Sequence, residues 1–476
     1  MYRNIALITF ILSASVCAHS QVFDAVIAAD GSGDYTSIQS AVDRIRTASE
    51  RHIFYIKPGV YVEKVSIAKD NVSLIGSGTD EVVVSWDDYS GDDDGHSTSS
   101  SYTFQVDGDN FYAENITFKN TAGNVGQAVA VSTTGTHQVF RNCSFLGFQD
   151  TYYARKGMQY LNNCYIEGAT DFIFGESTAV FDECEIVCVQ GGQYITAPAD
   201  TKLISQVNGE PFYHGLFFLE SEIIAGAGVG DDSYYLGRPW QPNSTSVYVN
   251  CILGTHIKSE GWSEWNDNNH LSAFFAEYNS MNSNEEPIDV SGRVNWSVQL
   301  TESERSNYEL DFFLNGWDPK ESYKTTDIPV GMVVELSKDT VRIEWSGITG
   351  AIGYAVMKNN SVYGFSENLS FKDAEGLATD EYAVASINGF GVFSDYSGPA
   401  KPSVVLSNEV DIHRQLKNGI LYMSEPVKIQ VYSLTGKKLI TRHHENQINL
   451  SGLKQGVYLI TLEDSHGRLI VEKVAI

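Results

Sequence analysis

The chain has 476 residues, and 32 Lys and Arg stand against 60 Asp and Glu, which gives a formal net charge of −28. This length accommodates two or three domains, and the ordinary composition excludes a fibrous or a disordered protein. The charge excludes nucleic acid as a partner, because binding a phosphate backbone requires clustered Lys and Arg.

The N-terminal segment, residues 1–20, has the features of a signal peptide. Arg3 precedes an apolar run over residues 5–14, and small residues follow up to Ser20. The run is too short to span a bilayer and no later segment is suited to it, so we expect an exported protein without a membrane span. Cys17 leaves a lipid anchor as the alternative.

A short unit recurs along the first half of the chain: a polar residue, usually Asn, followed by alternating apolar and polar residues. Copies begin at Asn71, Asn115, Asn142, Asn163, Glu183 and Asn250. The interval is 21 residues from Asn142 to Asn163 and 20 from Asn163 to Glu183. At roughly 3.3 Å per residue in a strand, about 21 residues make one turn of a three-sided coil.

These repeats predict an all-β protein in which residues 24–320 form a right-handed parallel β-helix. Stacked coils pair edge to edge and bury their inward side chains in one column, which no single repeat could do. Residues 37–45 have apolar side chains at helical spacing, and we expect this segment to cap the open N-terminal end.

Five cysteines follow the signal peptide: Cys143, Cys164, Cys184, Cys188 and Cys251. Cys164 and Cys184 lie one coil apart, and stacking would bring their Cα atoms to about 5 Å, within the range of a disulfide. An internal ladder of reduced, buried cysteines is equally compatible with this spacing.

The pattern changes after Pro319. Residues 325–402 contain short alternating strands around Trp345 and Tyr354 and resemble a fibronectin type III domain, a small β-sandwich. Residues 404–476 resemble the C-terminal sorting domain of the type IX secretion pathway. The resemblance implies that this last domain is an export signal.

Four short strings in the predicted β-helix carry polar groups that a solenoid does not need for folding. They span residues 127–131, 147–151, 168–175 and 235–240. Gln127 and Gln149 are 22 residues apart, and Asp150 and Asp171 are 21 apart. One coil therefore separates each pair, and strands of neighbouring coils lie about 5 Å apart. The sequence predicts two adjacent carboxylates with amide groups beside them.

Two carboxylates this close in a partly buried cleft should not both ionise freely, so the pKa of one should rise while a cation stabilises the other. Arg238, in the fourth string, is the candidate cation. A bidentate guanidinium would keep Asp171 ionised and leave Asp150 to carry a proton. The amides of Gln127 and Gln149 are suited to stabilising an oxyanion.

With residues 59–63 upstream and 261–265 downstream, the four strings resemble the pectin methylesterase family over residues 24–280. The resemblance implies hydrolysis of the methyl esters of pectin. It makes Asp171 the nucleophile, Asp150 the proton donor and then the base, and the two glutamines the transition-state stabilisers. Arg238 also matches a residue that contacts substrate, and the further substrate contacts we expect are Thr98, Phe172, Trp240 and Trp262.

The mechanism that the resemblance implies uses no metal or other cofactor, and clustered His or Cys ligands at metal-binding spacing are absent from the sequence. The acidic segment 86–94 raises a calcium hypothesis, because oxygen ligands at short spacing suit that ion. It lacks the ligand order of an EF-hand, and a solvated insertion between coils is the interpretation we favour.

The expected partners are methylated homogalacturonan and the type IX secretion machinery, and we expect a secreted or cell-surface monomer. Three other functions fit parts of the pattern. A pectate lyase or polygalacturonase uses the same scaffold to cut the polysaccharide chain. A β-helix could also bind carbohydrate without catalysis, or keep this site as an esterase or thioesterase for another substrate.

Overall fold

The computed structural model describes residues 22–476, apart from 48, 201–204, 208–209, 213, 307, 338–339, 405–413, 435 and 464–468. The predicted signal peptide, residues 1–20, and Cys17 lie outside the described residues. Among the helices that are described, none is long and apolar enough to cross a membrane.

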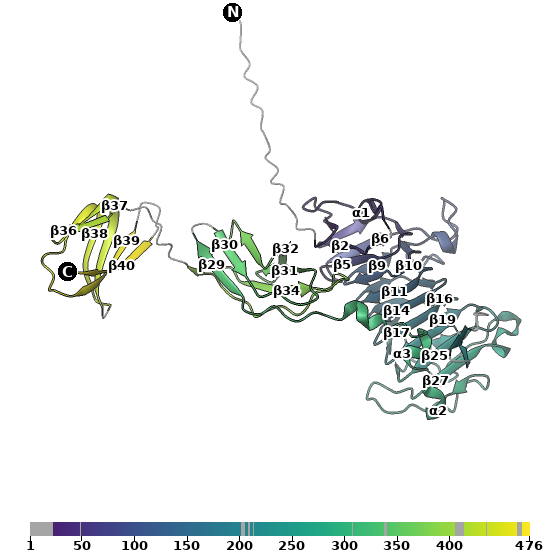
Figure 1. Ribbon diagram of the computed structural model, residues 1–476. Helices are drawn as coiled ribbons and strands as arrows, with labels where there is room; N and C mark the ends of the chain where they lie inside the picture. The colour runs from purple at the N-terminus through teal and green to yellow at the C-terminus, as the bar shows by residue number, and fades with distance from the viewer. Residues whose placement is uncertain are drawn as a thin grey trace, which may run out of the picture.

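Three parallel sheets run side by side and form a β-helix, coloured purple to teal in Figure 1. Sheet 1 consists, in spatial order, of β1 (Ala25–Ile27), β2 (His52–Ile56), β5 (Val72–Gly76), β8 (Tyr112–Glu114), β11 (Thr136–Arg141), β14 (Met158–Asn162), β17 (Thr178–Asp182), β22 (Leu216–Leu219), β25 (Thr245–Val249), β27 (Phe274–Tyr278) and β28 (Val298–Gln299). Each strand pairs with the strand of the next coil, which confirms the predicted β-helix.

The other two sheets are built from the same coils. Sheet 2 consists of β4 (Val65–Ile67), β7 (Phe104–Val106), β10 (Val131–Thr133), β13 (Tyr152–Ala154), β16 (Thr170–Gly175), β19 (Tyr194–Pro198) and β24 (Tyr235–Gly237). Sheet 3 consists of β3 (Gly59–Val62), β6 (Val82–Trp86), β9 (Thr117–Asn120), β12 (Ser144–Leu146), β15 (Tyr165–Gly168), β18 (Glu185–Cys188), β23 (Glu222–Ala225) and β26 (Ile252–Leu253). A hairpin of β20 (Ser205–Val207) and β21 (Glu210–Phe212) lies outside them.

The polar residue that begins each repeat is where the chain turns from sheet 1 into sheet 3. Asn142 and Asn163, which follow β11 and β14, have φ values of 49° and 52°. Asparagine adopts this left-handed conformation at lower cost than most residues with a side chain. Each repeat therefore begins at a corner of the coil. The corner residues of adjacent coils also contact each other, because the Nδ2 group of Asn163 donates to Oδ1 of Asn142 at 2.7 Å.

The apolar residues of the repeats fill the interior of the coils. Phe118 and Phe145 stack with ring centroids 5.8 Å apart, and both side chains are fully buried. All five cysteines in the described residues are free and buried. The Sγ atoms of Cys164 and Cys184 donate to backbone carbonyls at 3.4 Å, so the structure contains the reduced ladder and not the disulfide.

A single helical turn covers the N-terminal end of the column. Helix α1 (Ile38–Val42) is shorter than the predicted 37–45 and packs against β1 and β4, the end strands of sheets 1 and 2. The Glu63 carboxylate accepts from the amide of Ile38 at 2.7 Å and from the Ser37 hydroxyl at 2.7 Å. Glu63 thus satisfies the first turn of α1, and this part of the motif at 59–63 is structural.

After β28 the chain returns along the outer face of sheet 1 through α2 (Glu302–Arg305), α3 (Leu310–Phe313) and η3 (Pro319–Tyr323), of which α3 packs on β17 and η3 on β11. It then forms two sheets that share a core around Trp345. One has the order β33 (Ser370–Asp373), β30 (Thr340–Glu344), β29 (Val333–Ser337), β35 (Ser403–Val404), and the other β32 (Ser361–Ser366), β31 (Gly353–Lys358), β34 (Tyr382–Ile387). The fibronectin type III assignment of this domain stays a prediction.

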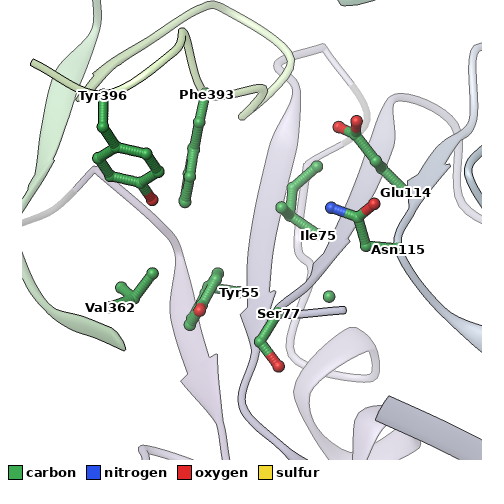
Figure 2. Close-up of a pocket in the computed structure, with 9 residues that line it drawn as sticks. Tyr55, Ile75, Ser77, Glu114, Asn115, Val362, Phe393 and Tyr396 are labelled. Carbon is green, nitrogen blue, oxygen red and sulfur yellow. The ribbon is translucent and has the colours of Figure 1, made fainter. Parts of the chain in front are cut away.

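The two-sheet domain packs against the first coils through aromatic side chains. The ring of Phe365 lies 4.5 Å from that of Phe23 and 4.9 Å from that of Tyr55. Figure 2 shows the junction, where Phe393 and Tyr396 face Tyr55 across a cavity of about 230 Å³. The contact is apolar and continuous with the outer core of sheet 1, so the two domains form one packed unit.

The last part of the chain, yellow in Figure 1, is an antiparallel sheet. Its strands are β36 (Arg414–Lys417), β37 (Ile420–Ser433), β38 (Lys438–Asn449), β39 (Val457–Glu463) and β40 (Leu469–Ala475). The domain has its own core, which includes Ile429, Val431 and Ile460. This is the region in which we predicted the sorting domain.

Candidate active site

The polar strings meet on sheet 2, at the entrance to β10, β13 and β16. Gln127 pairs with Gln149, and Gln149 pairs with Thr170, as bridges between successive coils. The next residues, Asp150 and Asp171, are therefore neighbours in adjacent coils, and the amide of Asp150 donates to the Thr170 carbonyl at 3.2 Å. The stack that the 21-residue spacing predicts is present.

Both aspartates have a positive φ, 67° for Asp150 and 49° for Asp171. Such backbone conformations cost free energy and persist only where the surrounding structure enforces them. The corner before β16 is also tight, because a Cβ atom at Gly168 would lie 2.2 Å from the Cβ of Phe172. The chain therefore holds the two carboxylates in place by its turns.

Arg238 follows β24 and reaches across β19 to Asp171. Its Nε donates to Oδ1 of Asp171 at 2.9 Å and its Nη2 to Oδ2 at 2.6 Å, which is the bidentate geometry that the sequence predicts. The guanidinium carbon lies 3.8 Å from the ring centroid of Tyr194 and 4.0 Å from that of Trp265. Arg238 is thus held between two aromatic faces and cannot easily leave Asp171.

The surroundings raise the pKa of both aspartates, but the charged groups that act on each one differ. Burial, and then the negative charge of Asp171, raise the pKa of Asp150 well above its ordinary value, against weaker opposition from the Gln149 side chain and from Arg238. Burial also raises the pKa of Asp171, but its hydrogen bonds and ion pair with Arg238 oppose this directly. The site thus favours protonation of Asp150 over protonation of Asp171, which Arg238 opposes.

The raised pKa of Asp150 predicts how the stability of the folded protein depends on pH. The protonated form of Asp150 stabilises the folded protein fully below the unfolded pKa of about 3.9, and that contribution is lost as the pH rises through the folded pKa. Asparagine does not titrate, so Asp150→Asn should raise the melting temperature of the β-helix relative to wild type at pH 8 by about 2 °C or more, but not at pH 3. Calorimetry of both proteins from pH 3 to 8 measures the difference, and an equal loss at every pH would contradict it.

An aromatic surface lies beside the carboxylates. The rings of Tyr153 and Phe174 stack at 4.1 Å and 14°, and Trp240 meets Phe174 edge-on at 6.0 Å. These rings and Tyr102, Trp265 and two small apolar residues form one cluster, in which Tyr153 and Trp240 stay partly exposed. Trp240 therefore lies partly exposed in this cluster, and its contact with substrate stays a prediction.

Two predicted substrate contacts lie elsewhere. Phe172 and Trp262 are 0% and 1% exposed and belong to the interior column. A side chain without accessible surface cannot touch a sugar ring, so we withdraw both assignments. Thr98 lies half-buried in the turn η1 (Thr98–Ser100), and none of the contacts between described residues joins it to either aspartate.

Sequence reasoning missed Tyr153, which stacks on Phe174 beside the carboxylates, and Tyr194, which packs on Arg238. Tyr153 stands three residues after Asp150, but Tyr194 lies on β19, one strand further along sheet 2 than Asp171. The spacing of 23 residues between Asp171 and Tyr194 gave a weak signal, because the register of β16 and β19 shifts between Thr170 and Ile173.

Ion pairs with His96 and Lys64 hold the acidic segment 86–94 in place. Ligand atoms of Asp88, Asp92 and His96 lie within 4.8 Å of one another. His96 contacts both carboxylates, at 3.2 and 2.7 Å, and Lys64 pairs with Asp88. The backbone amide and the ring of His96 hold the pKa of Asp92 at about 2. Ser90 donates to the Gln127 carbonyl at 2.8 Å, so this insertion is anchored beside the site instead of being freely solvated.

Comparison with known protein families shows which family the chain belongs to. The pectinesterase family model matches residues 24–317, more than half of the chain, and covers the whole β-helix with its stacked carboxylates. The chain belongs to the pectinesterase family. The secretion-system C-terminal sorting domain model matches residues 406–476, which confirms the predicted sorting domain.

Individual pectinesterases agree with this assignment. The chain is 38% identical over 305 residues to a probable pectinesterase/pectinesterase inhibitor 6 of Arabidopsis thaliana, covering 62% of this chain and 52% of that protein. It is 36% identical over 310 residues to pectinesterase 31 of Arabidopsis thaliana, covering 62% of this chain and 92% of that protein. This chain therefore spans about half the length of the first relative and nearly all of the second.

Solved pectin methylesterase structures share the fold. A carrot pectin methylesterase superposes with a TM-score of 0.57 at 30% identity, covering 62% of this chain and 93% of that one. The pectin methylesterase PemA from Erwinia chrysanthemi gives a TM-score of 0.53 at 25% identity, covering 62% and 98%. The similarity covers the β-helix and not the C-terminal domains.

Proposed function

We propose that this protein hydrolyses the methyl esters of pectin, releasing methanol and free galacturonate carboxylates. The observation that carries the proposal is the pair of stacked aspartates in a chain of the pectinesterase family: Arg238 pairs with Asp171, and the pKa of Asp150 is raised well above its ordinary value. An ionised carboxylate beside a protonated one is the arrangement that acyl transfer by a nucleophile and a general acid requires.

In the first step Asp171 attacks the C6 carbonyl carbon of a methylated galacturonate. The carbonyl oxygen becomes negative, and the amides of Gln127 and Gln149 donate hydrogen bonds to it. Both glutamines are half-buried on the same stack, as this role requires. The intermediate collapses by breaking the bond between C6 and the methoxy oxygen, and Asp150 gives its proton to the departing methanol.

In the second step a water molecule attacks C6 of the acyl-enzyme. Asp150, now ionised, takes a proton from this water, and the bond between C6 and the Asp171 oxygen breaks. The products are a galacturonic acid, whose remaining proton passes to solvent and leaves the free carboxylate, and the original Asp171 carboxylate, with one proton of the water back on Asp150. Burial and the charge of Asp171 raise the pKa of Asp150, so it is suited to exchanging a proton in both steps.

The C-terminal domain supports export by the type IX pathway, and we propose that the protein acts outside the cell or on its surface. Two other functions remain as alternatives: a β-helix that binds carbohydrate without catalysis, and an esterase or thioesterase for another substrate. The ion pair at Arg238 and the raised pKa of Asp150 favour catalysis over simple binding, because a sugar-binding surface needs neither.

Incubation of the purified protein with highly methylated pectin tests the proposal. We expect methanol release and acidification without an immediate fall in viscosity, because the glycosidic bonds stay intact. A rapid loss of viscosity would instead indicate a depolymerase. Binding of pectin without any methanol would indicate a carbohydrate-binding protein.

A further inference from the structure

The cavity between the β-helix and the two-sheet domain is lined by groups of two kinds. Tyr55 of β2 and Phe393 and Tyr396 of the two-sheet domain present aromatic rings to it, as Figure 2 shows. The rings of Tyr55 and Phe393 are nearly parallel, at 20°, with centroids 6.1 Å apart. The facing wall is polar and comes from Ser77 and Asn115, the corner residues that follow β5 and β8. The cavity therefore offers ring faces on one side and hydrogen-bonding groups on the other.

The two corner residues have unused hydrogen-bonding groups. The Oγ atom of Ser77 is buried and forms no hydrogen bond with the described residues. Asn115 has a φ of 60°, like the other corner asparagines, but its side-chain amide also lacks a partner in the part of the chain that the structure describes. The corner asparagines Asn163 and Asn142 bond to each other instead. A buried polar group without a partner costs free energy, which a ligand that pairs with it recovers.

The hydroxyls of Tyr55 and Tyr396 add two further unused groups. Neither forms a hydrogen bond with another described residue. Burial raises the pKa of both phenols, and the neighbouring Tyr396 adds to the rise at Tyr55, so the two hydroxyls lie close together. Tyr55 is 3% exposed, whereas Phe393 and Tyr396 stay partly exposed at the rim of the cavity. A molecule can therefore enter from solution.

The charges around the cavity disfavour an acidic ligand. Glu114 is the one carboxyl among the lining residues, and none of these residues is Lys, Arg or His. Arg141 pairs with Glu114, and the Tyr112 hydroxyl donates to it at 3.0 Å, so this carboxylate already has its partners. A second carboxylate in the cavity would lose its water and gain no cation. A neutral ligand incurs no such cost.

The volume of the cavity, about 230 Å³, limits the ligand to a small molecule. Pockets for drug-sized ligands have roughly 300 to 1,000 Å³, so this one has room for about one ring and not for a polysaccharide chain. Aromatic faces suit the C–H surfaces of a sugar ring, and free hydroxyl and amide groups suit its hydroxyls.

We propose that this cavity binds a single neutral hexose ring, such as the terminal sugar of a polysaccharide branch. The site is separate from the candidate active site, because Tyr55 belongs to sheet 1 whereas Asp150 and Asp171 lie on sheet 2. Binding of a branch end would hold the protein on a polysaccharide without engaging the carboxylates. The inference is therefore independent of the proposed function.

The methyl groups of Ile75 and Val362 line the cavity and report on its occupant. We expect galactose to shift their nuclear magnetic resonance signals saturably in the full chain. The Kd should be on the order of 1 mM, the strength that a ligand of this size reaches at ordinary efficiency per atom. Galacturonic acid differs from galactose only at C6 and should bind about tenfold more weakly or less, because its carboxylate finds no cation. Equal affinity for the two sugars, or no saturable shift with galactose up to about 100 mM, overturns the proposal.

Two substitutions each remove one hydrogen-bonding group from the cavity. We expect Ser77→Ala and Asn115→Gly each to raise the Kd for galactose about fivefold, as loss of one neutral hydrogen bond implies. The Ser77 hydroxyl has no partner in the free protein, so Ser77→Ala should leave the melting temperature unchanged or raise it, which separates a binding role from a structural one. Glycine tolerates the positive φ of Asn115, so Asn115→Gly should keep the corner intact.

Asn163→Gly is the matched control. Asn163 has the same corner position, with a φ of 52°, but lies outside the cavity, so its replacement should leave the Kd within twofold. An unchanged Kd in both Ser77→Ala and Asn115→Gly would mean that galactose binds elsewhere and would overturn the site. All three variants should release methanol from methylated homogalacturonan as wild type does. Failure of the wild type in that assay would overturn the proposed function and leave the sugar site standing, so the two failures are distinguishable.

Discussion

Replacing Asp171 with asparagine should reduce methanol release from methylated pectin at least a thousandfold. The amide has nearly the shape of the carboxylate but is no nucleophile, so the covalent route is lost while sugar binding remains. Arg238 can still donate to the remaining oxygen. Burial raises the pKa of Asp171, and an uncharged replacement should therefore cost the fold little. Turnover and the melting temperature, measured on the same preparation, test both statements.

Asp107→Asn is the matched control for this experiment. Asp107 is a half-buried carboxylate directly after β7 on the same sheet, where it accepts from Thr134 and Gln105 at 2.6 Å. Its replacement should change turnover less than twofold. If Asp171→Asn retained a tenth of the wild-type rate, Asp171 would not be the nucleophile, and a water activated elsewhere in the site would have to replace it.

Replacing Arg238 with glutamine should lower kcat/KM about a hundredfold at pH 7, which corresponds to about 2.7 kcal/mol of transition-state stabilisation. Arg238 is the group that opposes the rise in the pKa of Asp171, so its loss moves that pKa higher. A larger fraction of Asp171 is then protonated and inactive at neutral pH. The residual activity should rise with pH further than in wild type, and a pH profile of kcat/KM from 5 to 9 measures this shift.

Arg141→Gln separates this effect from a general loss of stability. Arg141 pairs with the buried Glu114 on sheet 1, whose pKa is also raised by burial, so the two variants disturb similar ion pairs. Only Arg238→Gln should move the pH profile. An unshifted profile in Arg238→Gln would mean that the guanidinium binds substrate without controlling the ionisation of Asp171.

The path of the chain around the β-helix could be predicted because the repeat has a physical cause. Each coil turns at a residue with positive φ, which favours asparagine, and the interval between such residues is the length of one coil. Because the strands of adjacent coils pair in parallel, residues that are one coil length apart in the sequence lie side by side in the sheet. The 21-residue interval from Asp150 to Asp171 was enough to put both carboxylates on one sheet, and the string at 235–240 supplied their cation.

The sequence could not predict which side of a strand each side chain faces. Ordinary alternation would turn Phe172 and Ile173 to opposite sides, yet both face the column, because the pairing of β16 with β19 shifts between Thr170 and Ile173. An irregularity of this kind depends on the neighbouring coil, and periodicity cannot reveal it. In the motif at 261–265, Trp262 is part of the core, whereas Trp265 reaches the site.

What the sequence alone determined is the coil length, the order of the domains and the set of residues that share one face. Only the tertiary structure decided which aromatic rings hold Arg238, since Tyr194 and Trp265 come from separate segments that meet through coil stacking. Contacts of this kind depend on packing between distant segments, and local patterns carry no record of them.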